Sequence, residues 1–204
     1  MMKKIIATSI VTATLASGSA FAAGAQTGVV IGGDIGYTMP SGYLKDIDPD
    51  STADNKNGNI AGGIFIGYDM ALSQMLSVGL ELDGQYAYNL AKTTDSGITV
   101  KVSNLSIPLF LTGKFYIPNT GGLNLFGKAG YAYNRLNVSA DAGSNASLSD
   151  NTNLWRPVVA GGVGYQLQQF NIFAQYQYNW LPYQGQNGGY STLSLGLSYT
   201  IPTM

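Results

Sequence analysis

Residues 76–90 alternate strictly between two faces, and this pattern limits the fold more than any other feature of the chain. The even positions are apolar apart from Gly84, whereas the odd positions are polar or small and include Glu81 and Asp83. A period of two indicates a β-strand with one apolar and one polar face. Strands of globular proteins usually have about 5–6 residues, so this strand is unusually long. A globular sandwich would bury the apolar face in its core, whereas a transmembrane barrel turns that face toward lipid and keeps polar residues in its lumen.

The same alternation recurs along the chain and predicts eight strands. They cover residues 28–39, 60–70, 76–90, 98–117, 123–138, 154–167, 170–180 and 190–201. In the fourth strand the apolar residues change from even to odd positions near Ser103 and Asn104, which predicts a β-bulge at that point. Connections after odd-numbered strands have 20, 7, 15 and 9 residues, while the others are short. Short turns at one end and long loops at the other are typical of outer-membrane barrels. We therefore predict an all-β, eight-stranded, antiparallel up-and-down transmembrane β-barrel with both termini on the periplasmic side.

Aromatic residues gather near both ends of these predicted strands. Tyr37, Tyr86, Tyr88, Tyr131, Tyr133, Trp155, Tyr178 and Trp180 fall near the long loops. Tyr68, Phe115, Tyr165, Phe170 and Tyr199 fall near the short turns. Tyrosine and tryptophan are enriched where a membrane meets water, so the two groups predict two aromatic girdles.

The N-terminus has the features of a secretory signal peptide. Two lysines precede the short apolar segment 5–16, and Ala20-Phe21-Ala22 forms an A-x-A cleavage site. The apolar segment is too short to span a bilayer, which takes about 20 residues. We expect residues 1–22 to be removed and residues 23–204 to form one barrel domain in the bacterial outer membrane.

Composition excludes several classes of function. Ten basic against eleven acidic residues leave no basic face for nucleic acid, and charged residues make up only 10%, against about 25% in typical globular domains. The chain has no cysteine and no histidine, so it lacks thiolate chemistry and the usual general base of nucleophilic catalysis. We expect no cofactor, no metal centre and no enzymatic activity, although a site built from carboxylates alone stays open.

Charged residues on the polar faces of the strands form a balanced set. They are Asp34, Glu81 and Asp83 against Lys114, Lys128 and Arg156. An eight-stranded barrel is just wide enough for side chains to fill, and an unpaired charge inside it would be costly. We expect these residues to pair in a polar plug; the alternative is a narrow path for ions or water. Lys101 lies beyond the change of periodicity, so the pattern does not assign its face.

The first long loop is acidic and contains Asp46, Asp48, Asp50 and Asp54. Asp46, Asp48 and Asp50 have the D-x-D-x-D spacing of a calcium loop, but Pro49 interrupts it and Ser51 replaces the turn glycine. A solvated loop is therefore expected, with weak divalent-cation binding as the alternative. Loop lysines can contact phosphates of lipopolysaccharide; they are Lys45, Lys56 and Lys92.

Two segments carry a resemblance to a known family. Gly196, Tyr199 and Ile201 are spaced like the C-terminal signal of outer-membrane barrels, and residues 106–116 (SIPLFLTGKFY) are similar to a strand common in them. The chain resembles the eight-stranded outer-membrane β-barrel superfamily, which includes the outer-membrane protein X, Ail and opacity-protein families and the barrel of outer-membrane protein A. The resemblance implies recognition by the barrel-assembly machinery, contact with outer-membrane lipid and lipopolysaccharide, and a monomeric state. It also implies a non-enzymatic role in envelope integrity or, through surface loops, in adhesion to host molecules. A narrow porin-like channel is the alternative.

Overall fold

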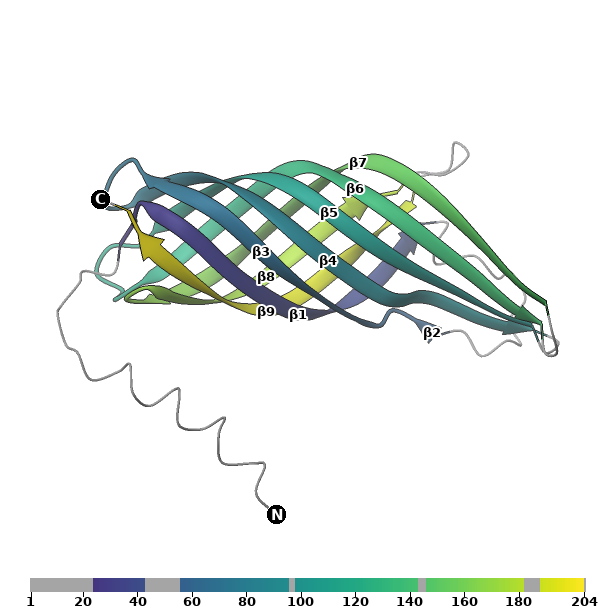
Figure 1. Ribbon diagram of the computed structural model, residues 1–204. Helices are drawn as coiled ribbons and strands as arrows, with labels where there is room; N and C mark the ends of the chain where they lie inside the picture. The colour runs from purple at the N-terminus through teal and green to yellow at the C-terminus, as the bar shows by residue number, and fades with distance from the viewer. Residues whose placement is uncertain (1–23, 43–55, 96–97, 143–145, 182–187, 204) are drawn as a thin grey trace, which may run out of the picture.

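The computed structural model describes residues 24–42, 56–95, 98–142, 146–181 and 188–203, and every regular element in these ranges is a β-strand (Figure 1). The strands are β1 (Gly28–Gly42), β2 (Lys56–Asn57), β3 (Ile60–Ala71), β4 (Leu76–Asp95), β5 (Ile98–Tyr116), β6 (Leu123–Ala142), β7 (Ala146–Leu167), β8 (Phe170–Trp180) and β9 (Gly188–Pro202). Within these ranges, no helix is long and apolar enough to cross a bilayer.

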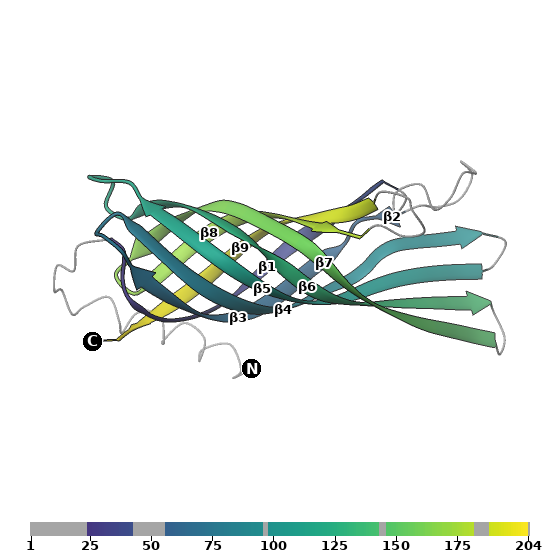
Figure 2. The ribbon, with the colours of Figure 1, turned by 90° about the horizontal axis from the view of Figure 1, so that it is seen from above.

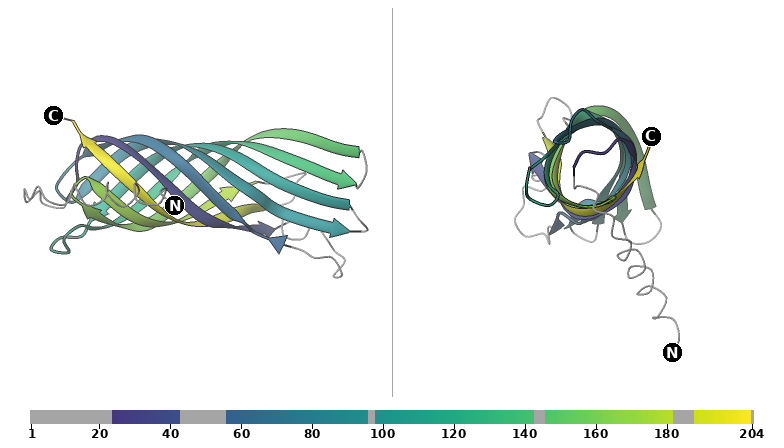
Figure 3. Two further views of the ribbon diagram at one scale, coloured as in Figure 1. Left: turned by 60° about the horizontal axis from the view of Figure 1, so that its bottom comes forward. Right: turned by 90° about the vertical axis from the view of Figure 1, so that its left-hand side faces the viewer.

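Eight of the strands close into a barrel. Each pairs antiparallel with both neighbours in the order β4-β3-β1-β9-β8-β7-β6-β5, and pairing of β4 with β5 completes the ring. The end-on view in Figure 3 shows the closed circle of strands. The short strand β2 adds to the edge of β4 by pairing Lys56 with Lys92 and Asn57 with Ala91. The predicted eight-stranded antiparallel barrel is therefore confirmed.

The two ends of the barrel differ. One end carries the short turns 72–75, 117–122 and 168–169 together with residues 24–27 and 203, and we call it the turn end. The other end carries the connections that follow β1, β4, β6 and β8, and we call it the loop end.

The barrel reverses the usual distribution of polar and apolar side chains. On β8, Ile172 and Tyr176 are exposed on the outer wall, whereas Gln175 and Gln177 are buried inside. Large contiguous apolar surfaces are rare on globular monomers. The alternation that predicts the strands thus separates an apolar outer wall from a polar lumen.

Four strands continue beyond the barrel at the loop end. Strands β4, β5, β6 and β7 form a projecting sheet, which Figure 2 shows from above. The β4–β5 hairpin extends to the pair Asp95–Ile98, and the β6–β7 hairpin to the pair Ala142–Ala146. The interpretation of residues 91–97 and 139–153 as loops is therefore wrong for most of both segments. Polar side chains suggest a loop, but backbone pairing between adjacent strands does not require apolar side chains.

The predicted bulge is also corrected. The register shift lies between Ala87 and Ala91 of β4, where residues 88–90 face only Ser103 of β5. The pairing of β5 with β6 runs without a break through Ser103 and Asn104. The extra residues therefore belong to β4, and the change of periodicity in β5 falls where the projecting sheet begins.

Candidate functional site

The centre of the lumen contains an ion pair surrounded by aromatic rings. Glu81 of β4 accepts a hydrogen bond from Lys128 of β6 within a salt bridge, and both side chains are only 5% exposed. The Lys128 ammonium lies 5.1–5.8 Å from the centroids of four rings, those of Phe65, Phe110, Phe126 and Phe173. A desolvated cation–π contact contributes about 2 kcal/mol or more. This cation is therefore held by one carboxylate and a shell of phenylalanines.

The phenylalanines occupy inward positions of the alternating pattern, but nothing in that pattern indicates their shared contact with Lys128. The rings of Phe65 and Phe126 lie 5.9 and 5.8 Å from that of Phe173. They come from β3, β6 and β8, which are far apart in the chain. The alternation predicts that each phenylalanine points into the lumen, but it does not predict which side chains contact one another there.

Nearer the turn end, Lys114 pairs with a residue outside the predicted charge set. Its Nζ lies 2.6 Å from Oδ2 of Asp69. Asp69 is on the inward face of β3 and is 7% exposed. The alternation of β3 puts Asp69 on the same face as Phe65 and Ala61. Asp69 could therefore be assigned to the lumen charges from the sequence.

The remaining predicted charges do not form ion pairs with described residues. Asp34 accepts a hydrogen bond of 2.8 Å from the Ser194 hydroxyl, and Asp83 Oδ2 accepts one of 3.1 Å from Gln85 Nε2. Arg156 Nη1 donates to the carbonyl oxygen of Trp155 at 3.4 Å. The structure thus brings together Glu81 and Lys128 but does not produce the expected three-to-three pairing.

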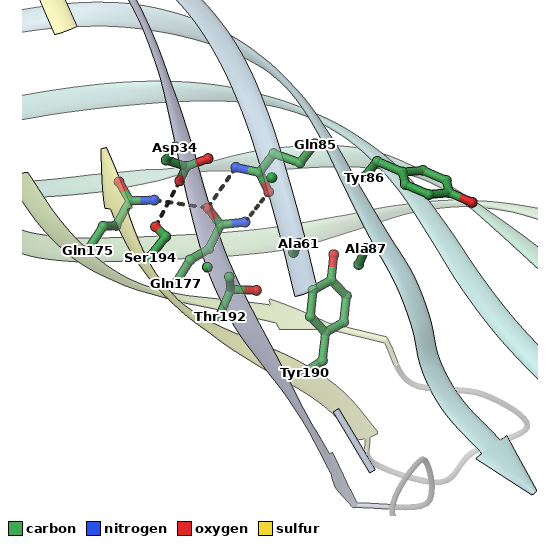
Figure 4. Close-up of a pocket in the computed structure, with 12 residues that line it drawn as sticks. Asp34, Ala61, Gln85, Tyr86, Ala87, Gln175, Gln177, Tyr190, Thr192 and Ser194 are labelled. Carbon is green, nitrogen blue, oxygen red and sulfur yellow. Dashed lines mark hydrogen bonds between the residues drawn. The ribbon is translucent and has the colours of Figure 1, made fainter. Parts of the chain in front are cut away.

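Amide side chains cross the lumen between the ion pair and the loop end. Gln85 of β4 and Gln177 of β8 exchange two hydrogen bonds of 3.0 and 2.7 Å, as Figure 4 shows. Three strands separate β4 from β8 in either direction around the ring, so these residues join opposite walls. Asn104 Nδ2 donates to Tyr190 Oη and to Asn134 Oδ1, both at 2.9 Å.

Apolar residues cover this network at the loop end, and the N-terminal segment crosses the turn end. Ala61, Ala87, Leu136, Leu181 and Tyr190 form one buried cluster, against which Leu154 packs. At the opposite end, the Ala25 amide donates to the carbonyl of Gln74, and Gln26 Nε2 donates to that of Gln168. These acceptors belong to different turns, so residues 24–27 bridge part of the opening.

Two lumen cavities lie between these layers, and each has a volume of about 10 Å³. This volume corresponds to about one water molecule. Neither of these two cavities therefore holds more than about one water molecule.

The residues expected in the aromatic girdles lie on the outer wall. Ten are exposed, and Tyr133, Tyr178 and Tyr199 are partly buried; the exposed ones are Tyr37, Tyr68, Tyr86, Tyr88, Phe115, Tyr131, Trp155, Tyr165, Phe170 and Trp180. Neighbouring rings pack together, with 4.8 Å between the centroids of Tyr178 and Trp180 and 4.9 Å between those of Phe170 and Tyr199.

The residues of the expected assembly signal lie on β9. Ile201 is exposed, and Tyr199 donates a hydrogen bond to Gln169 in the neighbouring turn. A Cβ atom at Gly196 would overlap the Phe173 ring, so this glycine makes room for an aromatic side chain of the lumen.

The acidic loop prediction falls outside the described residues. This applies to Asp46, Asp48, Asp50 and Asp54 and to Lys45. In the part of the chain that is described, no group of three acidic, histidine or cysteine side chains is placed to hold a metal ion.

Comparison with known structures places this fold among outer-membrane barrels. Neisserial surface protein A is 15% identical with a TM-score of 0.60, and the match covers 85% of this chain and 97% of that one. OprG of Pseudomonas aeruginosa is 11% identical with a TM-score of 0.52, covering 90% and 100%. Ail of Yersinia pestis is 14% identical with a TM-score of 0.47, covering 86% and 99%. At such low identities, the first two matches show similarity of fold alone.

A search of curated proteins found no match. The model of the family described as "Outer membrane protein beta-barrel domain" matches residues 8–200. This match confirms the resemblance to outer-membrane barrels and implies a location in the bacterial outer membrane. Because it covers most of the sequence, the chain belongs to the outer membrane protein beta-barrel domain family.

Proposed function

We propose that this protein is a non-enzymatic, non-conducting barrel that supports the outer membrane and acts through the surface at its loop end. In this proposal residues 1–22 are a cleaved signal peptide, the turn end faces the periplasm, and the loop end faces outward. The observation that carries it is the filling of the lumen by side chains from opposite walls. An ion crossing the barrel would have to separate Glu81 from Lys128 and Gln85 from Gln177.

The projecting sheet supports a role in surface contact. Within the described residues, β7 pairs with β6 from Ala146 onward, but its pairing with β8 begins only at Val158. Residues 146–157 thus form an edge of the sheet, and an unpaired strand edge can accept an extended segment of another protein. A host or environmental protein that adds a strand there is the proposed partner.

Other proposed partners follow from the outer wall and the last strand. Outer-membrane lipid and lipopolysaccharide would surround the apolar wall between the aromatic girdles. The barrel-assembly machinery would recognise β9 through Gly196, Tyr199 and Ile201. The proposed state of the barrel is monomeric.

Conductance of the purified protein in planar lipid bilayers tests the closed lumen. We expect little or no steady current, because each layer of the lumen is held by direct side-chain contacts. A variant that truncates the central layer, with Glu81, Lys128 and Phe173 all changed to alanine, serves as the comparison and should conduct more than the native chain. Large and reproducible channels from the native protein would contradict the proposal.

A narrow porin-like channel is the second candidate. The polar lining of the cavity near Asp34 favours it, because Gln85, Gln175 and Ser194 also contribute to that lining. The same bilayer recording distinguishes the two functions.

A further inference from the structure

The middle of the lumen contains more carboxylates than cations. Asp69 and Lys114 balance each other near the turn end, and Glu81 pairs with Lys128. Asp34 and Asp83 have only neutral hydrogen-bond donors among the described side chains, Ser194 and Gln85. Buried charges are costly unless a counter-charge compensates them.

A cavity of about 10 Å³ lies beside this excess of negative charge. Figure 4 shows Asp34, Gln175 and Ser194 around it, from β1, β8 and β9. Gln175 is 3% exposed, and its Oε1 accepts no hydrogen bond from any described residue. Asp83, which is 4% exposed, also has one carboxylate oxygen without a partner in the described chain. Buried oxygens are normally satisfied, so Gln175 Oε1 lacks a donor or a cation in this cavity; Asp83 lies outside the cavity lining.

The chemistry of the cavity selects the kind of partner. Its unsatisfied group, Gln175 Oε1, is an oxygen, and the Asp34 carboxylate lines the same cavity; both are ligands for hard cations. Divalent cations such as calcium take six to eight oxygens, with several carboxylates, and no group of three acidic side chains suited to a metal ion exists in the described part. One carboxylate with neutral oxygens fits a monovalent ion. The volume alone would also admit water, but a water molecule would leave an ionised Asp34 carboxylate without a counter-charge.

We propose that this cavity binds one monovalent metal cation, sodium or potassium, through the Asp34 carboxylate and Gln175 Oε1. Gln85 connects Asp83 to the same glutamine network, and the Asp83 carboxylate adds negative charge nearby. The ion compensates the charge of the Asp34 carboxylate, and this proposal does not depend on whether the protein acts at the cell surface.

The test compares equilibrium unfolding of the refolded barrel in detergent in chlorides of sodium, potassium and N-methylglucamine at equal ionic strength. N-methylglucammonium is too large for the cavity. The equilibrium constant for unfolding should fall about tenfold for each tenfold rise in sodium or potassium above its dissociation constant. Equal unfolding curves in all three salts would overturn the proposal.

Two variants assign the effect to this cavity. Asp34→Asn should abolish the dependence on sodium or potassium while leaving the protein at least as stable in N-methylglucamine chloride. Asp69→Asn is the matched control, because it removes a lumen carboxylate outside the cavity and should keep the dependence. If Asp34→Asn does not fold, Gln175→Met tests the second ligand, and it should weaken the response. Retention of the full response in the variant that folds would refute the site.

Discussion

At the scale of residues, the centre of the lumen is asymmetric in charge. Lys128 is the one cation among the described residues that contacts both Glu81 and the four phenylalanine rings. Asp34 and Asp83 remain nearby as additional acids. Removal of the Lys128 cation and removal of the Glu81 carboxylate should therefore change the free energy of unfolding by unequal amounts.

We predict that Lys128→Met destabilises the barrel more than Glu81→Gln. The first change leaves Glu81 buried without a cation, and breaking a buried pair in this way typically costs about 3–5 kcal/mol. After the second change the ammonium keeps its rings and the other carboxylates. Urea unfolding of both single variants and the double variant measures the free energies, and the double variant should recover part of the loss. A larger cost for Glu81→Gln would contradict this account.

At Gly196 there is no room for any side chain larger than a hydrogen atom. A Cβ there would overlap the Phe173 ring, which itself packs against Phe65 and Phe126. Gly196→Ala should therefore cost about 1–3 kcal/mol through overpacking. Gly113→Ala is the control, since a Cβ at that position of β5 meets no atom within 4 Å. Denaturant midpoints of the two variants should differ clearly; equal midpoints would exclude steric crowding at Gly196.

At the scale of elements, β6 and β7 serve two structural roles. Their turn-end halves form part of the barrel wall, and their loop-end halves belong to the projecting sheet, of which β7 forms an edge. The sequence of the loop-end halves is polar, so their pairing depends on the backbone and on the continuation of the ladder from the barrel. The edge can therefore be shortened without disturbing the lumen.

We predict that shortening the β6–β7 hairpin reduces attachment of cells to the surface or host cell that the protein binds. Residues 140–148 are replaced by Asn-Gly, a two-residue turn that suits a hairpin, between the paired Ser139 and Ser149. Attachment of cells expressing each variant gives the measurement.

The matched control shortens the β4–β5 hairpin in the same way, with residues 93–100 replaced between the paired Lys92 and Lys101. It leaves the β7 edge in place and should retain most of the attachment. Equal losses in both variants would argue against recognition at the β7 edge.

At the scale of the whole molecule, closure of the ring leaves no free strand edge within the barrel wall. The N-terminal strand β1 pairs with the C-terminal strand β9 over the full length of both, from Gly28–Pro202 to Gly42–Gly188. Closure therefore requires the last strand, and no described part of the wall can open without breaking a complete ladder.

This closure predicts heat-modifiable migration in detergent gels. Unheated protein should run as a compact band, and boiling should shift it to slower migration, because the closed ladder resists the detergent at low temperature. The protein should also need detergent to stay dispersed, given its apolar outer wall. Identical mobility before and after boiling would contradict a closed barrel.

The sequence by itself determined the strand number, the closed-barrel class and the face of most side chains. Alternation is a local property, since successive side chains of a strand point to opposite sides. Leu80 and Glu81 show this directly, because Leu80 is exposed on the outer wall and Glu81 is buried in the lumen. The strand ends at the projecting sheet escaped prediction because pairing continues there without an apolar face.

Only the tertiary structure decided which lumen residues meet. The tilt and stagger of strands in a barrel bring residues of distant strands to one level, and the parity of each strand carries no information on that level. Lys114 therefore meets Asp69 rather than a member of the predicted charge set, and Asp34 remains beside a cavity without a cation from the described chain. Local alternation fixes the direction of each side chain, whereas the stagger of the closed ring fixes its partner.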